Sequence, residues 1–476
     1  MGYSVPDEWF LRLRHSRPRF KNQVEDVLFY MASEICRIGT KETELFRTEL
    51  NQAIQRFPGN ANLEIKTINN WRTEIDALFG LILKTDETQG PSKLAIHLNE
   101  TQDLVSFFKL FLTKFQYPGG HVKPNWSADL INLDVRFKPA LFVIRVLLAG
   151  QSRVTDGNFW LSKAEAASLI WNDLRVTTGQ RTEVQVAEEI IQLRKSKISL
   201  DSDGDVTRYA GDILDYMVLA NILRAQYGGR YSLVKGAMEN AKMVLSDTKF
   251  FKGYEDLYGT GSATGQQVAK LENLWFEYAG NQIDLTYDKI DPLEVLEALA
   301  DNIEDPVDAQ TAHDLLGYLR SKIKDGQKIG TKETGDLGEN IALRHEFKRL
   351  TTIGEPKLAK RVKKIPDKLG VGYDIKSFKD ASEDARFIEV KTSISHGKLN
   401  VMRFHLTRNE WKVAETSGDS YFVFRILVSA KSLSCFVLQN PVKQYKQDLA
   451  SMIINKDGSA DITFTEKSGY WEKLLI

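Results

Sequence analysis

The chain has very few cysteines and no long apolar run. Only Cys36 and Cys435 occur among its 476 residues, which is too few for a disulfide framework or a cysteine zinc site. No stretch approaches the roughly 20 apolar residues that a membrane helix needs, and residues 1–8 lack the pattern of a signal peptide. We therefore expect a cytoplasmic protein with buried free thiols and no membrane partner.

The chain also lacks a net charge, an internal repeat and a low-complexity tract. It holds 64 Lys+Arg against 64 Asp+Glu, and its 10% aromatic content argues against disorder. The charge is nevertheless uneven. Residues 331–476 contain 25 basic and 19 acidic side chains, a net of +6, which leaves −6 for the remainder. A chain of this length is too long for one core, so several domains are expected.

Residues 1–130 carry a pattern of three amphipathic helices followed by two strand-like runs. Apolar side chains recur at helical spacing in three segments, residues 24–35, 45–54 and 68–78. Thr67 is a good N-cap for the third helix. Strands are expected over residues 79–83 and 94–98, with Gly90 and Pro91 in the loop between them. Three helices and a β-ribbon predict a winged helix, although an ordinary helical domain with a hairpin fits the same pattern.

The third helix would carry a polar face opposite its apolar one. The side chains on that face are Asn69, Asn70, Arg72 and Thr73. Such side chains can reach base edges or phosphates. We predict that they contact DNA.

A second region of similar character covers residues 131–283. Capping signals at Ser162 and Thr182 begin two helices, and a long helix is expected over residues 210–223. Two glycines then turn the chain into residues 230–234, a candidate wing. This region is predicted to be a second winged-helix-like DNA-recognition domain.

Residues 284–330 are predicted to be an acidic helical linker, because residues 284–308 hold nine Asp+Glu and one Lys. The last domain, residues 331–476, has the order αβββαββ. Its expected helices are residues 337–350 and 408–415, and its expected strands are residues 371–379, 386–394, 401–406, 421–428 and 435–438. This order predicts an α/β domain with a central mixed sheet and helices packed against it.

The first two strands of this domain bring three charged side chains to one face. Side chains alternate along a strand, so Glu389 and Lys391 lie on the same side. An antiparallel hairpin with Lys379 opposite Arg386 places Asp374 opposite Lys391 and diagonal to Glu389. A register slipped by one residue would set apolar side chains against the charged ones.

This combination suits Mg²⁺-dependent phosphodiester hydrolysis. Mg²⁺ needs only one or two carboxylates plus a carbonyl, which Asp374, Glu389 and the carbonyl of Val390 can supply, and Mn²⁺ can substitute. Lys391 could orient or deprotonate the attacking water. Alternatively, Asp374 and Lys391 are a cross-strand ion pair worth roughly 0.2–1 kcal/mol. Glu339 can likewise be a helix cap rather than an active-site residue. Glu410, which forms a capping box with Thr407, is expected to be a cap rather than a ligand, and Trp411 is expected to be a core residue.

A basic cluster precedes the candidate site. It comprises Lys357, Lys360, Arg361, Lys363, Lys364 and Lys368, with only Asp367 opposing it. Such a cluster suits phosphates, and we expect Lys360, Arg361, Lys363 and Lys364 to contact DNA. A solvated loop is the competing interpretation.

Four motifs in residues 335–440 carry a family resemblance. They are Gly338-Glu339, Gly372-Tyr373-Asp374-Ile375, Phe387 to Thr392, and Leu406 to Glu410. In this order they resemble the NO VEIN C-terminal-type domain, a branch of the PD-(D/E)xK nuclease superfamily. The resemblance implies that Asp374 and Glu389 are metal ligands, that Lys391 is the catalytic lysine and that Glu339 is the acidic residue of the first helix. Tyr373 stands where some members have proline.

The whole architecture resembles restriction endonucleases that separate recognition from cleavage. The sequence therefore predicts a Mg²⁺-dependent double-stranded DNA endonuclease of restriction or phage-defence type. One active centre per chain implies transient homodimerisation on DNA. A repair or modification-dependent nuclease, and a non-catalytic DNA-binding or scaffold protein that retains the fold, stay open as alternatives.

Overall fold

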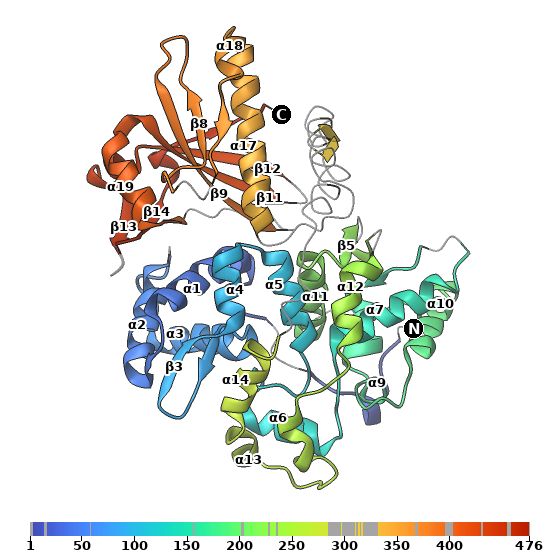
Figure 1. Cartoon of the computed structure of the whole chain (residues 1–476). Coiled ribbons are helices and arrows are strands. Elements are labelled where there is room, and N and C mark those ends of the chain that lie inside the picture. Colours follow the sequence, from blue (N-terminus) through green and yellow to red (C-terminus); the bar gives the residue numbers. More distant parts are fainter. Residues whose placement is uncertain are drawn as a thin grey trace. The chain divides into compact units, whose positions relative to one another are not determined.

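The computed structural model divides the chain into two compact units (Figure 1). The N-terminal unit comprises residues 1–100 and 105–287, and the C-terminal unit comprises residues 101–104 and 288–476. The described residues are 3–13, 17–57, 59–155, 158–200, 204–226, 229–234, 237–283, 332–366, 370–395, 403–429, 432–454 and 458–475, with 297, 310, 313, 314, 316 and 317. Most of the predicted acidic linker therefore lies outside them.

The N-terminal unit begins with the three predicted helices. They are α1 (Val24–Ile38), α2 (Thr43–Arg56) and α3 (Ile65–Thr73), which continues as the π-helical turn η3 (Glu74–Leu78). A short strand before α2 joins a hairpin after η3, so that β1 (Lys41–Glu42), β3 (Thr88–Pro91) and β2 (Ile82–Lys84) form an antiparallel sheet in that order.

Three local predictions in this region are wrong. The segment expected as a second strand, residues 94–98, lies in α4 (Lys93–Thr101). The reason is Ser92, whose hydroxyl accepts the N–H of Ala95 at 3.1 Å and so caps a helix. Gly90 and Pro91 therefore lie in β3 rather than in a loop, and Thr67 lies inside α3, whose N-cap is Glu64.

The second region also has a short strand, a run of helices and then a hairpin, with more helices in the run than in the first region. Its members are α7 (Pro139–Gln151), β4 (Leu161–Ser162), α8 (Lys163–Ala166), η4 (Ala167–Trp171), α9 (Leu174–Thr177), α10 (Glu183–Lys195), α11 (Asp205–Leu219), β5 (Leu223–Gln226) and β6 (Arg230–Leu233). The short strand β4 pairs with the last strand of the hairpin, which gives the sheet order β4-β6-β5. The predicted capping box at Ser162 and the predicted N-cap at Thr182 are confirmed, and Thr182 also forms a capping box with Gln185.

The N-terminal unit has further helices and buried clusters of aromatic side chains. The further helices are α5 (Leu104–Lys114), α6 (Pro124–Asn132), α12 (Ala237–Ser246), η5 (Lys252–Leu257), α13 (Gly265–Ala269) and α14 (Glu272–Gly280). Phe108 on α5 stacks on Tyr216 of α11 with ring centroids 5.4 Å apart, and Phe79 contacts the same tyrosine edge-on. Side chains of both predicted N-terminal regions thus share one core.

The C-terminal unit has the predicted central mixed sheet. Its strand order is β15-β12-β11-β9-β8-β7, in which β9 and β11 are parallel and the other pairs are antiparallel. These strands are β7 (Lys363–Lys364), β8 (Ile375–Phe378), β9 (Ala385–Ser395), β11 (Tyr421–Ser429), β12 (Leu433–Gln439) and β15 (Tyr470–Glu472). The predicted strand β10 (Arg403–Leu406) instead joins β14 (Ala460–Phe464) and β13 (Ala450–Ile454) in a second sheet.

Helices cover this sheet on both sides (Figure 1). The long helix α17 (Lys332–Thr352) packs on β8 and β9, and α18 (Pro356–Ala359) follows it. On the other face, α19 (Arg408–Ser417) and α20 (Pro441–Lys446) lie near the second sheet, and Trp411 is buried there with Tyr421, Val423 and Phe464. Trp411 is thus the core residue that the sequence predicts.

Two further expectations concern thiols and membranes. Both cysteines are free; Cys435 is buried as predicted, whereas Cys36 is only partly buried. No helix among the described residues has the length and apolar character needed to cross a membrane.

Candidate active site

Asp374 and Glu389 approach each other at the end of the β8–β9 hairpin. The observed pairs, Ile375 with Ile388 and Ser377 with Arg386, set the register. Extended by one residue, this register places Asp374 opposite Glu389 rather than opposite Lys391. The predicted register is therefore wrong by two residues. A shift of two keeps each side chain on its predicted face, because strand side chains alternate with period two.

Asp374 is held at this position by its backbone and its side chain. Its N–H donates to the carbonyl of Ile388 at 3.0 Å, and its Oδ2 accepts the N–H of Val390 at 2.7 Å. The loop before it is anchored as well, since Tyr373 packs on Phe387 with ring centroids 4.7 Å apart. The carboxylate therefore has a fixed place beside β9.

Lys391 bridges two carboxylates. Its Nζ lies 2.6 Å from Glu389 Oε1 and 3.0 Å from Glu410 Oε2. Glu410 is also the third residue of α19, and it completes the predicted capping box with Thr407. Glu410 is thus a helix cap, as expected from the sequence, and in addition a neighbour of the candidate catalytic lysine.

Burial and neighbouring charges shift the pKa values of Glu389 and Lys391. The side chain of Glu389 is only 4% exposed, and burial raises its pKa well above the usual value. Lys391 opposes this shift, while Asp374 and Glu410 add to it. The two carboxylates raise the pKa of Lys391 despite its burial. One ammonium thus faces three acidic side chains, and the surplus of negative charge favours a bound cation.

Glu339 lies in the interior of α17, because this helix begins at Lys332. The alternative that Glu339 caps the helix is therefore wrong. Lys364 on β7 lies 2.7 Å from Glu339 Oε2 and 2.6 Å from Asp336 Oδ1. Burial raises the pKa of Glu339 to about 7 against the effect of Lys364, and the charge of Asp374 adds to the rise. Glu339 is thus electrostatically coupled to the site.

Gly372 of the second motif allows close packing around the site. A β-carbon on Gly372, whose φ is +80°, would lie 2.7 Å from Val413 and 3.1 Å from the side chain of Asn409. Asn409 donates from Nδ2 to the carbonyl of Gly370 at 2.6 Å. The fourth motif is thus tied to the second through packing of α19 against the loop before Asp374.

The residues present fit a small hard cation. Asp374, Glu389 and the carbonyl of Val390 offer only oxygen ligands, the kind that Mg²⁺ prefers. No group of three or more His, Cys, Asp or Glu side chains in the described part of the chain is arranged to hold a metal. A site here would therefore rest on two carboxylates and the carbonyl, as the sequence predicts.

The predicted DNA-contacting residues fall into three settings. On α3, Asn69 and Thr73 are exposed, whereas Asn70 and Arg72 are half-buried and Arg72 donates to Asn51 Oδ1 at 3.2 Å. Lys360 and Lys363 are exposed near α18. Arg361 is exposed but pairs with Glu383 at 2.7 Å, and Lys364 belongs to the acidic site. Lys368 of the basic cluster lies outside the described residues.

Sequence reasoning gave no active-site role to Glu410 or to Lys364 with Asp336. The capping box at Thr407 located Glu410 correctly but could not indicate its contact with Lys391. Lys364 was expected on DNA, and only its pairing on β7 beside α17 brings it to Glu339. No local sequence signal reports such a contact.

The comparisons with known proteins match the N-terminal and C-terminal parts of the chain to different families. A family model described as "Restriction endonuclease BpuJI - N terminal" matches residues 3–276 of the 476. The chain belongs to this family. The BpuJ1 endonuclease binding domain, solved in complex with pyrene- and phenanthrene-modified DNA, is 26% identical, with a TM-score of 0.51 over 59% of this chain and all of that one.

The C-terminal part matches a second family model. "Protein NO VEIN, C-terminal" covers residues 338–438, in agreement with the resemblance drawn from the motifs. Protein NO VEIN of Arabidopsis thaliana is 22% identical over 231 residues, which are 48% of this chain and only 8% of that protein. This BpuJI-family chain thus joins a restriction-endonuclease-type N-terminal region to a NO VEIN-type C-terminal domain.

Proposed function

We propose that this BpuJI-family protein is a Mg²⁺-dependent double-stranded DNA endonuclease of restriction or phage-defence type. Residues 1–283 would recognise DNA and residues 331–476 would cut it. The observation that carries the proposal is the convergence of Asp374, Glu389 and Lys391 at one end of the β8–β9 hairpin. The BpuJI-type N-terminal region of the same chain supports DNA as the substrate.

Each residue of the acidic site would have a distinct role in hydrolysis. Asp374, Glu389 and the Val390 carbonyl would hold Mg²⁺, which supplies charge neutralisation at the scissile phosphate and an acidified water. Lys391 would orient the attacking water and stabilise the negative charge of the transition state. Glu410 keeps Lys391 protonated and in place, and Glu339 with Lys364 would shape the opposite wall of the site.

The C-terminal fold supports assignment to the PD-(D/E)xK superfamily. The mixed sheet contains the hairpin that carries Asp374, Glu389 and Lys391, and β9 and β11 pair in parallel within it. The acidic residue Glu339 lies on α17, the helix packed on this hairpin. This assignment rests on the motifs, their order and the NO VEIN match.

The N-terminal region would read DNA through winged-helix-like units. In both regions a short strand pairs with the last strand of a hairpin that follows a helix, the arrangement of a wing behind a recognition helix. In the first region that helix is α3, which exposes Asn69 and Thr73. We place the base-reading surface there and assign phosphate contacts to Lys360 and Lys363.

Double-strand cleavage would require two active centres or two successive nicks. We propose a transient homodimer formed on DNA, because each chain carries one candidate centre. The rate of double-strand cleavage should then rise more steeply than linearly with protein concentration, while nicking of one strand should rise linearly.

The decisive experiment is cleavage of duplex DNA by the purified chain and by Glu389→Ala, with Mg²⁺ or Mn²⁺. We expect cutting by the wild type and a loss of at least about 10²-fold in the variant, with DNA binding retained. Glu415→Gln, which alters an exposed residue of α19, is the matched control. Retained metal-dependent cutting by Glu389→Ala would refute the site. Absence of any wild-type cutting would favour a non-catalytic DNA-binding protein.

A further inference from the structure

A pocket of about 600 Å³ lies in the N-terminal unit. None of the residues predicted from the sequence to bind metal or DNA lines it. Its walls come from α5, α12, the segment after α12 and the end of α14, and include Lys114, Asp247, Lys249, Phe250, Lys252 and Tyr278. Small-molecule sites have volumes of about 300–1,000 Å³, so the pocket has the size of a ligand site.

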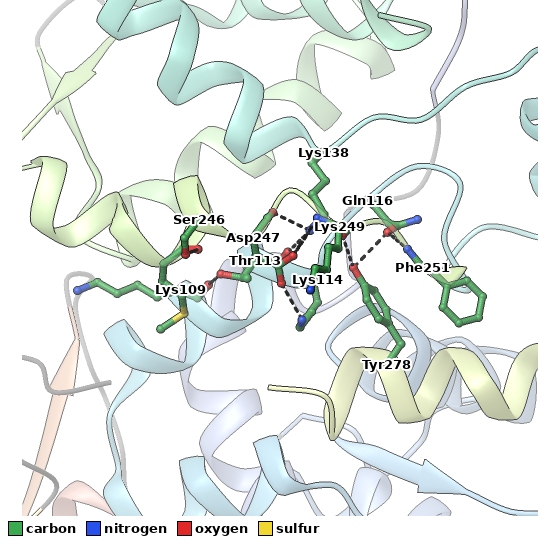
Figure 2. A network of polar contacts seen from close by, with 11 residues as sticks. Lys109, Thr113, Lys114, Gln116, Lys138, Ser246, Asp247, Lys249, Phe251 and Tyr278 are labelled. Carbon is green, nitrogen blue, oxygen red and sulfur yellow. Dashed lines mark hydrogen bonds and ion pairs between the residues drawn. The ribbon is translucent and has the colours of Figure 1, made fainter. Parts of the chain in front are cut away.

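Asp247 organises the basic side of the pocket (Figure 2). Its Oδ2 accepts from Lys114 at 2.7 Å and its Oδ1 accepts from Lys138 at 3.1 Å. Lys138 also donates to the carbonyls of Thr113 and Asp247, and its side chain is only 3% exposed. Two ammonium groups are thus fixed around a single carboxylate.

The electrostatics of this group favour an anion. Burial lowers the pKa of Lys138 to about 8, against the effect of Asp247. Burial alone would raise the pKa of Asp247, but Lys114 and Lys138 hold it below its usual value. Lys249 and Lys252 add two exposed ammonium groups at the rim, and neither forms an ion pair with a residue that the structure describes. The lining therefore carries more positive than negative charge.

Aromatic rings form the adjoining wall. The hydroxyl of Tyr278 lies 3.2 Å from Gln116 Oε1, and the same oxygen accepts the N–H of Phe251 at 2.8 Å. These contacts fix the tyrosine ring, and Lys114 Nζ lies 5.2 Å from its centroid. Phe250 lines the same pocket. If the lysines bind an anion, a planar ring attached to that anion would therefore lie beside aromatic side chains.

We propose that this pocket binds a mononucleotide. Its phosphate monoester would lie among Lys114, Lys249 and Lys252, and its base would stack on the partly exposed ring of Phe250, since bases stack on aromatic side chains in a sequence-tolerant way. The nucleotide can come from two sources, a free nucleotide or the phosphorylated end of a DNA strand. The binding requires no DNA cleavage, so the proposal goes beyond the endonuclease function.

The test is calorimetric titration of the full chain with deoxyadenosine monophosphate, with deoxyadenosine and inorganic phosphate titrated separately. The nucleotide should bind more tightly than either fragment. The double variant Lys249→Gln/Lys252→Gln should weaken nucleotide binding at least about tenfold, because it removes two charged partners of the phosphate. Phe250→Ala should weaken nucleotide binding without changing phosphate binding. Lys270→Gln, at an exposed lysine outside the pocket, should behave as wild type.

Two results would overturn the proposal. One is the absence of nucleotide binding at millimolar concentration, and the other is equal nucleotide affinity in the wild type and the double lysine variant. Adding a 5′-phosphorylated duplex then identifies the source. Displacement of the nucleotide would indicate a DNA end as the natural occupant, whereas simultaneous binding would indicate a free nucleotide. Neither result depends on whether Glu389 supports cleavage, so the two proposals fail independently.

Discussion

Gly338 on α17 packs directly against Thr392 on β9. A β-carbon on this glycine would stand 1.7 Å from Thr392 Oγ1, a distance that no packing tolerates. The same helix carries Glu339, and the same strand carries Glu389 and Lys391. The contact between Gly338 and Thr392 therefore sets the distance between α17 and the part of β9 that carries the site.

Gly338→Ala should destabilise the C-terminal unit by about 1–3 kcal/mol, because the added methyl group forces α17 away from β9. Gly335→Ala is the matched control on the same helix. Its β-carbon would meet only Glu339 Oε1 at 4.0 Å, so alanine should stabilise the helix by about 0.5–1 kcal/mol. Urea denaturation of both variants measures the difference, and equal effects would contradict the packing argument.

Lys391→Met should reduce DNA cleavage at least about 10²-fold while leaving DNA binding unchanged, because it removes the ammonium aimed at the attacking water. Single-turnover cleavage and a separate binding assay distinguish the two effects. Glu410→Gln should cause a smaller loss, since glutamine preserves the capping box but removes one charge beside Lys391. Larger damage from Glu410→Gln than from Lys391→Met would reverse the assigned roles.

Asp212 should make the stability of the N-terminal unit depend on pH. Its side chain is 3% exposed, and burial raises its pKa to about 6 although Lys21 and Arg17 lie 3.8 and 3.3 Å away. A raised carboxyl pKa means that the folded state retains a proton that the unfolded chain has lost. The stability gained from that proton is complete below about pH 4 and is lost as pH rises through 6.

Asp212→Asn should remove this dependence. We expect the free energy of unfolding of the wild type, relative to the variant, to fall by about 1–3 kcal/mol between pH 4 and pH 7. Urea denaturation of both proteins at four pH values in this range measures it. Parallel stability curves would contradict the assignment.

Lys360 and Lys363 should contribute to DNA affinity through phosphate contacts. Replacing either by Gln should lower the slope of log affinity against log salt by about 1, without changing sequence preference. Arg361→Gln should have a weaker effect because Glu383 already pairs with this guanidinium. Fluorescence anisotropy over a salt series is the measurement. A change in preferred sequence would instead indicate base contacts.

The sequence by itself determined the local features of this protein. Capping boxes at Ser162, Thr182 and Thr407 depend on residues three apart, and period-two alternation depends on one strand, so both could be predicted without knowing the fold. The same alternation placed Glu389 and Lys391 on one face.

Only the tertiary structure decided which of these local features meet. Two hairpin registers that differ by two residues leave the same faces exposed, so alternation could not choose between Glu389 and Lys391 as the neighbour of Asp374. The contacts of Glu410 with Lys391 and of Lys364 with Glu339 join distant segments. They depend on strand order and helix packing, which arise from burial summed over the whole domain rather than from any short stretch of sequence.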